Sequence, residues 1–268
     1  LNNLKVTHNL IWAVKEYSID THIVKLGTMG EYGTPNIDIE EGYLDITHNG
    51  RNETIPFPKR PHSFYHLSKV HDTNNILFTC RVWGLKATDL NQGVVYGNST
   101  EQVDMHDGLR TSFHYDEIFG TALNRFCTQA AIGKSLTVYG KGGQTRGFLN
   151  IRDTIRCVEL ASENPPQPGI CEIMNQFTET FSIKNLAELV NSAAREMGLK
   201  TTVDHIPNPR DELEDHYYNA KNEKLLKLGL NPHLLSKQVL QEIIKSIKLY
   251  EHHVDTTTIM PNIKWRQN

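Results

Sequence analysis

The chain has 268 residues, enough to bury a substantial core in one large domain or two small ones. Its 28 Lys and Arg residues against 31 Asp and Glu residues give a formal net charge of −3, and the basic residues are spread along the chain. That balance gives no electrostatic reason to expect a nucleic-acid partner. No run of about 18 apolar residues occurs, so we expect no membrane-spanning helix and no membrane partner.

Apolar residues at helical spacing predict a helix that is already in progress at the start of the chain, where the first residue is Leu. The run THIVKLGT follows and predicts a buried parallel strand. A long polar loop is then expected from about Met29 to Pro61, with a small hairpin around His48-Asn49-Gly50. Loops of this length inside a compact domain are usually functional.

A helix of roughly twenty residues is predicted from Ser63 to about Trp83. The stretch LKATDLNQGVVYG after it predicts a second strand with a terminal turn. Strand, helix and strand in this order form a βαβ unit, which predicts a parallel sheet and an α/β fold. Next come a helix at about 115–132, a strand LTVYG, a glycine-rich turn KGGQTRG and a helix beginning near Arg152.

The stretch SENPPQPG is the best linker candidate, because its prolines and closing glycine cannot continue a helix. A strand CEIMNQF, a helix SIKNLAELVNSAAREMG and a final helix at about 236–252 complete the predicted elements. The four cysteines are far apart and include no CxxC pair, so we expect neither a disulfide framework nor a metal site.

Tyr65 and Lys69 lie four residues apart on a predicted helix and therefore share one face. An ammonium group near a phenol favours the phenolate, so Lys69 is expected to lower the pKa of Tyr65 and make it usable as a base. Such a pair also occurs by chance on half-buried helices. Thr28 supports the functional interpretation, because it follows a predicted strand at the edge where ligand crevices form, although it could simply cap a turn.

Together, Thr28, Tyr65 and Lys69 resemble the catalytic trio of the short-chain dehydrogenase/reductase family. The resemblance implies that Tyr65 takes the proton of a sugar hydroxyl while a hydride passes to NAD. It also implies that Lys69 holds the cofactor ribose and that Thr28 anchors the sugar. The segments NQGVVYG and GGQTRGFLNIRD resemble the extended, epimerase/dehydratase branch, in which Arg146 matches a position that contacts a diphosphate.

This resemblance implies two further sets of residues. Cofactor binding is expected of Tyr65, Lys69 and Gln92. Substrate binding is expected of Thr28, Asn91, Gln92, Thr121, Gln144, Arg146 and Arg210. Either arginine could instead be a solvated surface residue.

Several long segments, among them KLGTMGEYGTPNIDIEEGY and SFYHLSKVHD, resemble the members of this branch that make a sulfonated sugar nucleotide from UDP-glucose and sulfite. The implied reaction is NAD-dependent oxidation at C4, elimination across C5 and C6, addition of sulfite and re-reduction at C4. His66 is the candidate for sulfite or proton transfer, although it could be a helix-surface histidine. The resemblance also implies a homodimer built on the first helix and the Tyr65 helix, in the cytoplasm, or in the plastid stroma of a photosynthetic eukaryote.

The pattern departs from the family in two places. Nucleotide-sugar 4,6-dehydratases carry an Asp-Glu pair directly after the Thr, whereas here Glu31 is the first acidic residue and becomes the candidate acid. The glycine-rich dinucleotide fingerprint is also absent, and family members carry roughly 120 further residues ahead of Leu1, which is consistent with missing βα units. A 4-epimerase or related dehydratase, and a non-catalytic UDP-sugar-binding remnant, therefore remain alternatives.

The predicted fold is a Rossmann-like parallel sheet that lacks its first βα units, followed by a smaller carboxy-terminal α/β substrate-binding domain. Residues 1–97 are assigned to the NAD-binding domain and residues 98–268 mainly to the nucleotide-sugar region, with elements at about 115–160 returning to the Rossmann sheet.

Overall fold

A computed structural model describes residues 2–209 and 216–260 of the chain. The chain forms two compact units. The first consists of Leu1–Gly93, Asp153–Phe177 and Tyr217–Pro232, and the second of Val94–Arg152, Thr178–His216 and His233–Asn268. The chain first passes from one unit to the other after Gly93, close to the predicted domain boundary at residue 97. The segments that return to the first unit begin at Asp153, so most of the expected returning stretch at 115–160 belongs to the second unit.

The first unit is built on a parallel sheet of order β1-β4-β8, formed by β1 (His22–Leu26), β4 (Lys86–Gln92) and β8 (Cys171–Gln176). Ile23 of β1 pairs with Ala87 of β4, and Ala87 pairs with Cys171 of β8. Helix α2 (Phe64–Trp83) lies in the chain between β1 and β4. The predicted βαβ unit and parallel sheet are therefore confirmed.

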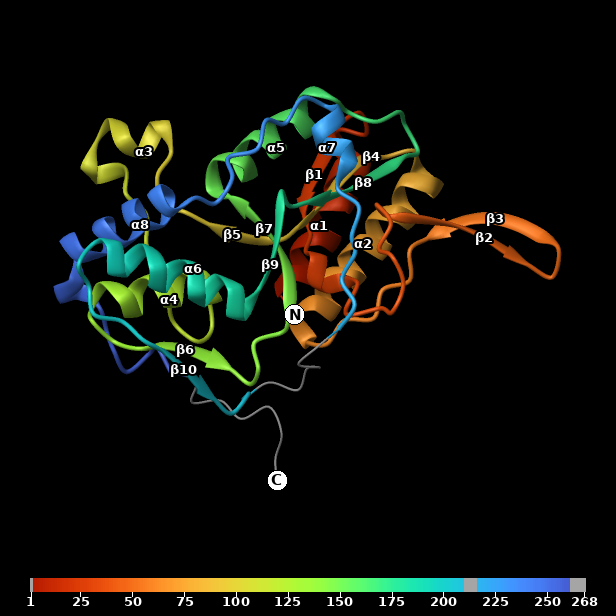
Figure 1. The fold of residues 1–268 in the computed structure, drawn as a ribbon. Coiled ribbons are helices and arrows are strands. Elements are labelled where there is room, and N and C mark those ends of the chain that lie inside the picture. The colour runs from red at the N-terminus through yellow and green to blue at the C-terminus, as the bar shows by residue number, and fades with distance from the viewer. Residues whose placement is uncertain (1, 210–215, 261–268) are drawn as a thin grey trace. The chain divides into compact units, whose positions relative to one another are not determined.

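Alternate residues of these strands bury opposite faces of the sheet, as the two-residue period of a strand requires. One face, with Ile23, Ala87 and Ile173, packs against α1 (Asn2–Tyr17) and α2. The other, with Leu90 and Met174, packs against α5 (Ile151–Glu163) and α7 (Glu223–Lys227). Figure 1 shows α1 and α2 side by side along the sheet. The first unit is thus a three-layer α/β arrangement.

Helix α2 has clear signals at both ends. Ser63 accepts a hydrogen bond from the backbone N–H of His66 at 3.1 Å, which is the N-cap geometry. Gly84 ends the helix with φ 72, the left-handed conformation that glycine adopts without strain. The predicted bounds of this helix are confirmed. They matter because they place Tyr65 and Lys69 in its first two turns.

The predicted long loop contains η1 (Met29–Glu31) and a hairpin of β2 (Tyr43–His48) and β3 (Arg51–Pro56), which Figure 1 shows projecting from the first unit. Asn49 and Gly50 join the two strands with φ 49 and φ 74, as a two-residue turn with two left-handed positions requires. The predicted hairpin is confirmed. The base of the loop is held by a small core of Met29, Tyr32, Ile39, Phe57 and Phe177.

The second unit contains a three-stranded and a two-stranded sheet, of orders β5-β7-β9 and β10-β6. The strands are β5 (Val94–Tyr96), β6 (Leu136–Tyr139), β7 (Thr145–Asn150), β9 (Glu179–Ser182) and β10 (Val203–Ile206). Its helices are α3 (Glu101–Met105), η2 (Asp107–Leu109), α4 (Ala122–Ala131), α6 (Ile183–Glu196), α8 (Lys237–Leu249) and η3 (Glu251–His253). The core lies among α4, α6 and α8, with side chains such as Phe126, Val190 and Ile244 fully buried.

Three sequence-based expectations differ from the structure. The predicted helix at 115–132 is shorter, because Asp116 accepts hydrogen bonds from the backbone N–H groups of Ile118 and Phe119 and holds a turn there. The stretch SENPPQPG joins α5 to β8 inside the first unit, so it is not a linker between units. The strand predicted over LKATDLNQGVVYG breaks at Gly93, which separates β4 from β5.

Candidate active site

Thr28 lies at the carboxyl end of β1, the edge of a parallel sheet where ligand crevices form. The strand pairing ends at Gly27, whose N–H donates to the carbonyl of Leu90 at 2.8 Å. Thr28 then caps η1 with φ −154, and its Oγ1 accepts from the N–H of Gly30 at 3.1 Å. Thr28 therefore caps a turn, and its hydroxyl proton is left to donate to another oxygen.

Tyr65 and Lys69 lie one turn apart on α2, with the Lys69 Nζ 5.9 Å from the centroid of the Tyr65 ring. The same Nζ donates to the carbonyl of Leu26, the last residue of β1, at 2.9 Å. Lys69 thus spans from α2 to the strand end that carries Thr28. Tyr65 is 56% exposed, so its phenol can meet a ligand. The predicted common face of the two residues is confirmed.

The pKa of Tyr65 departs from the sequence-based expectation. Partial burial raises this pKa above the ordinary tyrosine value, the Glu31 carboxylate adds to the rise, and the Lys25 ammonium opposes it. The expected lowering of the Tyr65 pKa is therefore wrong for the chain by itself, because burial and the Glu31 carboxylate outweigh the nearby positive charge. A lowered pKa would need a further positive group beside the phenol.

His66 points toward the turn at Thr28 although it follows Tyr65 on the helix. A Cβ placed on Gly30 would lie 2.4 Å from the His66 Nε2, so the imidazole packs directly on the backbone of Gly30. The rings of Tyr65 and His66 have centroids 5.3 Å apart. His66 therefore lies beside the turn that Thr28 caps.

Glu31 is fully buried beneath this turn. Its side chain closes a capping box with Thr28, accepting from the Thr28 N–H at 3.3 Å. It also pairs with Lys25 and Lys59. The sequence analysis did not identify these two lysines as part of the site. Lys25 could have been found, because a lysine inside the apolar strand HIVKL needs a buried partner.

Asn91 and Gln92 lie at the carboxyl end of β4, the strand next to β1. Asn91 is fully buried, and its amide donates to the hydroxyl of Tyr32 at 2.8 Å. The Gln92 amide donates to the Gln176 side chain at 3.2 Å and remains partly exposed. Both residues thus lie at the same sheet edge as Thr28. The Asn91 side chain is turned into the interior, where it bonds to Tyr32.

Three of the predicted substrate residues lie in the second unit. Thr121 caps α4 and accepts from the N–H of Asn124 at 3.4 Å. Gln144 is 2% exposed, and neither polar atom of its side chain has a hydrogen-bond partner among the described residues. Arg146, on β7, donates to the carbonyl of Thr145 and contacts the Nε2 of His216 at 3.0 Å. Arg210 lies outside the described residues.

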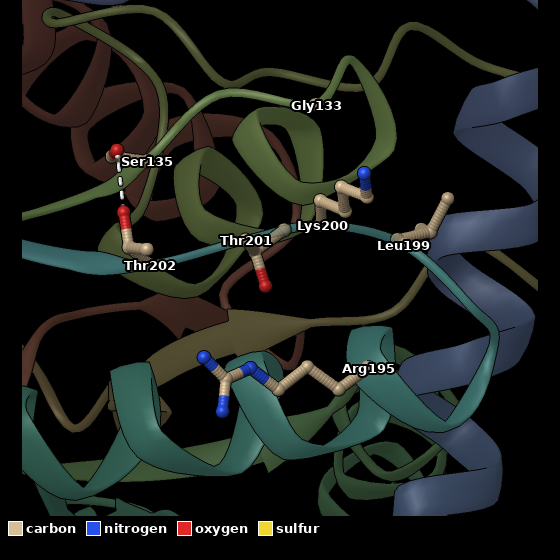
Figure 2. Close-up of a pocket in the computed structure, with 7 residues that line it drawn as sticks. All are labelled: Gly133, Ser135, Arg195, Leu199, Lys200, Thr201 and Thr202. Atoms are coloured by element: carbon tan, nitrogen blue, oxygen red, sulfur yellow. Dashed lines mark hydrogen bonds between the residues drawn. The ribbon is translucent and has the colours of Figure 1, made fainter.

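A pocket of about 400 Å³ also lies in the second unit, and Figure 2 shows its lining. Arg195 and Lys200 make it basic, and the hydroxyls of Ser135 and Thr202 lie 2.7 Å apart within it. The lining, which falls wholly within the described residues, contains none of the predicted site residues. The basic lining would favour an anion, but the pocket does not support the predicted substrate site.

Two further findings bear on the site. All four cysteines are free and buried. Within residues 2–209 and 216–260, no cluster of three or more His, Cys, Asp or Glu side chains is arranged to hold a metal ion, and no helix has the length and apolar character needed to cross a bilayer.

The model of the NAD dependent epimerase/dehydratase family matches residues 1–175. The chain is 59% identical over 266 residues to the chloroplastic UDP-sulfoquinovose synthase of Spinacia oleracea. The alignment covers 99% of this chain and 55% of the relative. It is 43% identical over 270 residues to the UDP-sulfoquinovose synthase of Sulfolobus acidocaldarius, covering 100% of this chain and 68% of the relative. The chain thus spans little more than half of the spinach relative.

The fold is similar to that of a solved UDP-glucose 4-epimerase from Thermotoga maritima, with a TM-score of 0.70, 18% identity, and coverage of 92% of this chain and 70% of that one. At this identity the likeness concerns the fold, and it confirms the predicted Rossmann-like class. The family match, with the identity to the two synthases, decides the membership. The chain belongs to the NAD dependent epimerase/dehydratase family.

Proposed function

We propose that this chain carries the catalytic residues of a UDP-sulfoquinovose synthase, which converts UDP-glucose and sulfite to UDP-sulfoquinovose with NAD. The observation that carries the proposal is the placement of Lys69 between the Tyr65 ring and the strand end beside Thr28. The identity to synthases from a plant and an archaeon supports the specific reaction.

The residues at this site fit NAD. The Lys69 ammonium carries three donors, of which the carbonyl of Leu26 takes one, and an exposed phenol lies beside it. Tyr65 and Lys69 would hold the cofactor ribose, with Gln92 near it at the end of β4. When bound, NAD supplies the acceptor and later the donor of a hydride at C4 of the sugar.

The chain's own residues then handle protons and orientation. Tyr65 takes the proton of the C4 hydroxyl, and a positive charge brought beside it would offset the raised pKa of the phenol. Thr28 donates a hydrogen bond from its hydroxyl to the sugar oxygen, because its Oγ1 already accepts from the N–H of Gly30. Both groups act on the same oxygen, which fixes the sugar at the sheet edge.

His66 is proposed to meet the sulfite. Its imidazole packs on Gly30, within the turn that Thr28 caps, and an imidazole near neutrality can donate a proton to an anion. This position would let it act on C6 chemistry while Tyr65 acts at C4. The assignment of His66 rests on its contact with Gly30, and the assignment of Tyr65 does not depend on it.

For the second unit we propose a role in binding the nucleotide part of the substrate. Gln144 is buried, and both polar groups of its side chain lack a hydrogen-bond partner among the described residues, which makes the side chain available to pair with a ligand. Arg146 offers a fork of donors suited to phosphate oxygens, and Thr121 offers a hydroxyl at a helix start. Arg210 is retained as a diphosphate candidate from the sequence.

We also propose a homodimer formed by α1 and α2 of two copies. Exposed apolar side chains on these helices would be covered in such a pairing: Val6, Leu10, Leu67, Phe78 and Val82. The spinach relative is named a chloroplastic protein; in a photosynthetic eukaryote we accordingly assign this protein to the plastid stroma, and elsewhere to the cytoplasm. Light scattering of the purified protein tests the dimer, and a monomer would refute it.

The decisive experiment supplies an enzyme containing this chain with UDP-glucose, sulfite and NAD and identifies the product by mass spectrometry. A sulfonated sugar nucleotide is expected. Recovery of UDP-galactose alone would indicate a 4-epimerase. Retention of UDP-sugar without any change in nicotinamide absorbance would indicate a binding protein without turnover.

A further inference from the structure

Four charged side chains meet beneath the turn that carries Thr28. The Lys25 Nζ lies 3.1 Å from Glu31 Oε1 and 2.9 Å from Asp89 Oδ2, and the Lys59 Nζ lies 2.5 Å from Glu31 Oε2. The two carboxylates are fully buried, and the two lysine side chains are 9% and 6% exposed. Two positive and two negative charges balance, which burial in a medium of low polarity requires.

Glu31 has no oxygen left for a substrate. Its Oε1 accepts from the Lys25 ammonium and from the Thr28 N–H, and its Oε2 accepts from the Lys59 ammonium and lies 2.9 Å from the Thr73 hydroxyl. Burial alone would raise the pKa of Glu31, but the ammonium groups of Lys59 and Lys25 outweigh it and hold the pKa below its usual value. Glu31 is therefore a poor proton donor at neutral pH.

The same contacts join three elements of the site. Glu31 holds the backbone of Thr28, and Lys59 brings in the end of the long loop after β3. The Lys25 ammonium also lies 3.3 Å from the backbone carbonyl of Lys69, while the Lys69 ammonium donates to the carbonyl of Leu26. The strand end and α2 are thus cross-linked by two lysines running in opposite directions.

We infer that Glu31, held by Lys25 and Lys59, is a positioning residue that fixes Thr28 relative to Tyr65 and Lys69, and is not the acid that assists elimination. The inference rests on the proposed function in one respect: C4 oxidation is the step for which Glu31 positions Thr28. It also gives the long loop a role in catalysis, because Lys59, near the end of that loop, pairs with Glu31 of the catalytic turn.

The test uses Glu31→Gln, Lys59→Met and the double variant in NAD-loaded enzyme. Formation of reduced cofactor is followed after UDP-glucose is added without sulfite. Glu31→Gln is expected to slow this step about 10²-fold, the scale that a shift of about 1 Å costs. The double variant restores charge balance and is expected to recover part of the loss. Glu223→Gln, which breaks the exposed pair with Lys227, is the matched control and should change nothing.

A second measurement does not depend on activity. Hydrogen exchange of the amides at 27–33, measured in the chain by itself, should become about tenfold faster in Glu31→Gln, because Thr28 and the loop lose a common anchor. Exchange in Glu223→Gln should match that of the unchanged chain.

The outcomes separate the two proposals. Normal C4 oxidation in Glu31→Gln with a block at the loss of water would make Glu31 the acid and overturn the inference. A double variant no faster than Glu31→Gln, with unchanged exchange, would overturn it too. If the unchanged enzyme reduces NAD but makes no sulfonated product, the proposed function fails while the test of Glu31 stands. If it reduces no NAD, the exchange result decides.

Discussion

The imidazole of His66 packs on the Cα of Gly30 so closely that a Cβ there would lie 2.4 Å from Nε2 and 2.5 Å from Cε1. Gly30 is not among the glycines with a positive φ, so its backbone conformation is one that other residues can also adopt. Glycine is therefore required at this position for space. A larger residue would push the His66 ring out of the turn.

The first prediction follows from this contact. Gly30→Ala should displace the imidazole and raise the KM for sulfite about tenfold or more, while formation of reduced cofactor from UDP-glucose changes much less. Initial rates at varied sulfite measure this. The double variant Gly30→Ala with His66→Ala removes the clash and should match His66→Ala by itself. An unchanged KM for sulfite in Gly30→Ala would contradict the proposed role of His66.

The second prediction concerns Tyr65. Tyr65→Phe should reduce C4 oxidation about 10²- to 10⁴-fold and leave UDP-sugar affinity nearly unchanged, because it removes a base and little contact area. In the chain without cofactor the pKa of Tyr65 is raised, so the phenolate fraction is small at neutral pH and grows as pH rises. Ultraviolet difference titration should show one titrating tyrosine fewer in Tyr65→Phe. The lost transition should be one that occurs at a pH above the ordinary tyrosine pKa. A phenol that titrates near neutrality without cofactor would refute this.

The sequence predicted where the three proposed catalytic residues lie, because local spacing decides most of their placement. Tyr65 and Lys69 share a face whenever the helix forms, and Thr28 follows a strand whose apolar run is unmistakable. The ion cluster could not be predicted in the same way. Lys59 and Glu31 are separated by 28 residues and a hairpin, and no periodic pattern records which buried lysine meets which carboxylate.

The same limit explains the division of the chain. The prolines of SENPPQPG indicate a break in structure, which is present, but local composition does not reveal that α5 and β8 on either side belong to one unit. That depends on β8 pairing with β4, residues Ala87 and Cys171 among them, far apart in sequence. Long-range strand pairing was therefore the information that the sequence did not supply.

The third prediction tests the packing around the ion cluster. A Cβ on Gly27 would lie 2.3 Å from the Oδ1 of Asp89 and 2.6 Å from the Oδ1 of Asn91, both buried. Gly27→Ala should lower the free energy of unfolding by about 1–3 kcal/mol, the usual cost of overpacking. Gly84→Ala is the comparison: its Cβ meets nothing within 4 Å, and it should show only the cost of φ +72, about 1 kcal/mol. Urea unfolding measures both, and a neutral Gly27→Ala would contradict the close packing.

The fourth prediction concerns acid. The folded-state pKa of Glu31 lies below its ordinary value, so the unfolded chain binds this proton more readily. The stability that Glu31 contributes is therefore present above the ordinary carboxyl pKa, about 4, and is lost as pH falls through the lower folded value. Glu31→Gln should be less stable than the unchanged chain at neutral pH, and the difference should shrink below about pH 4. A difference that is constant with pH would show that charge is not the cause.

The fifth prediction has the opposite sign. Asp72 is 2% exposed on α2, its Oδ1 has no partner among the described residues, and its pKa is raised, chiefly by burial. The folded state therefore binds this proton more readily than the unfolded chain. Stability is greatest below the ordinary carboxyl pKa and is lost as pH rises through the higher folded value. Asp72→Asn keeps the shape without the charge, so it should raise the urea midpoint at neutral pH, with a gain that disappears in acid. A gain that persists in acid would mean that packing, and not the buried charge, sets the effect.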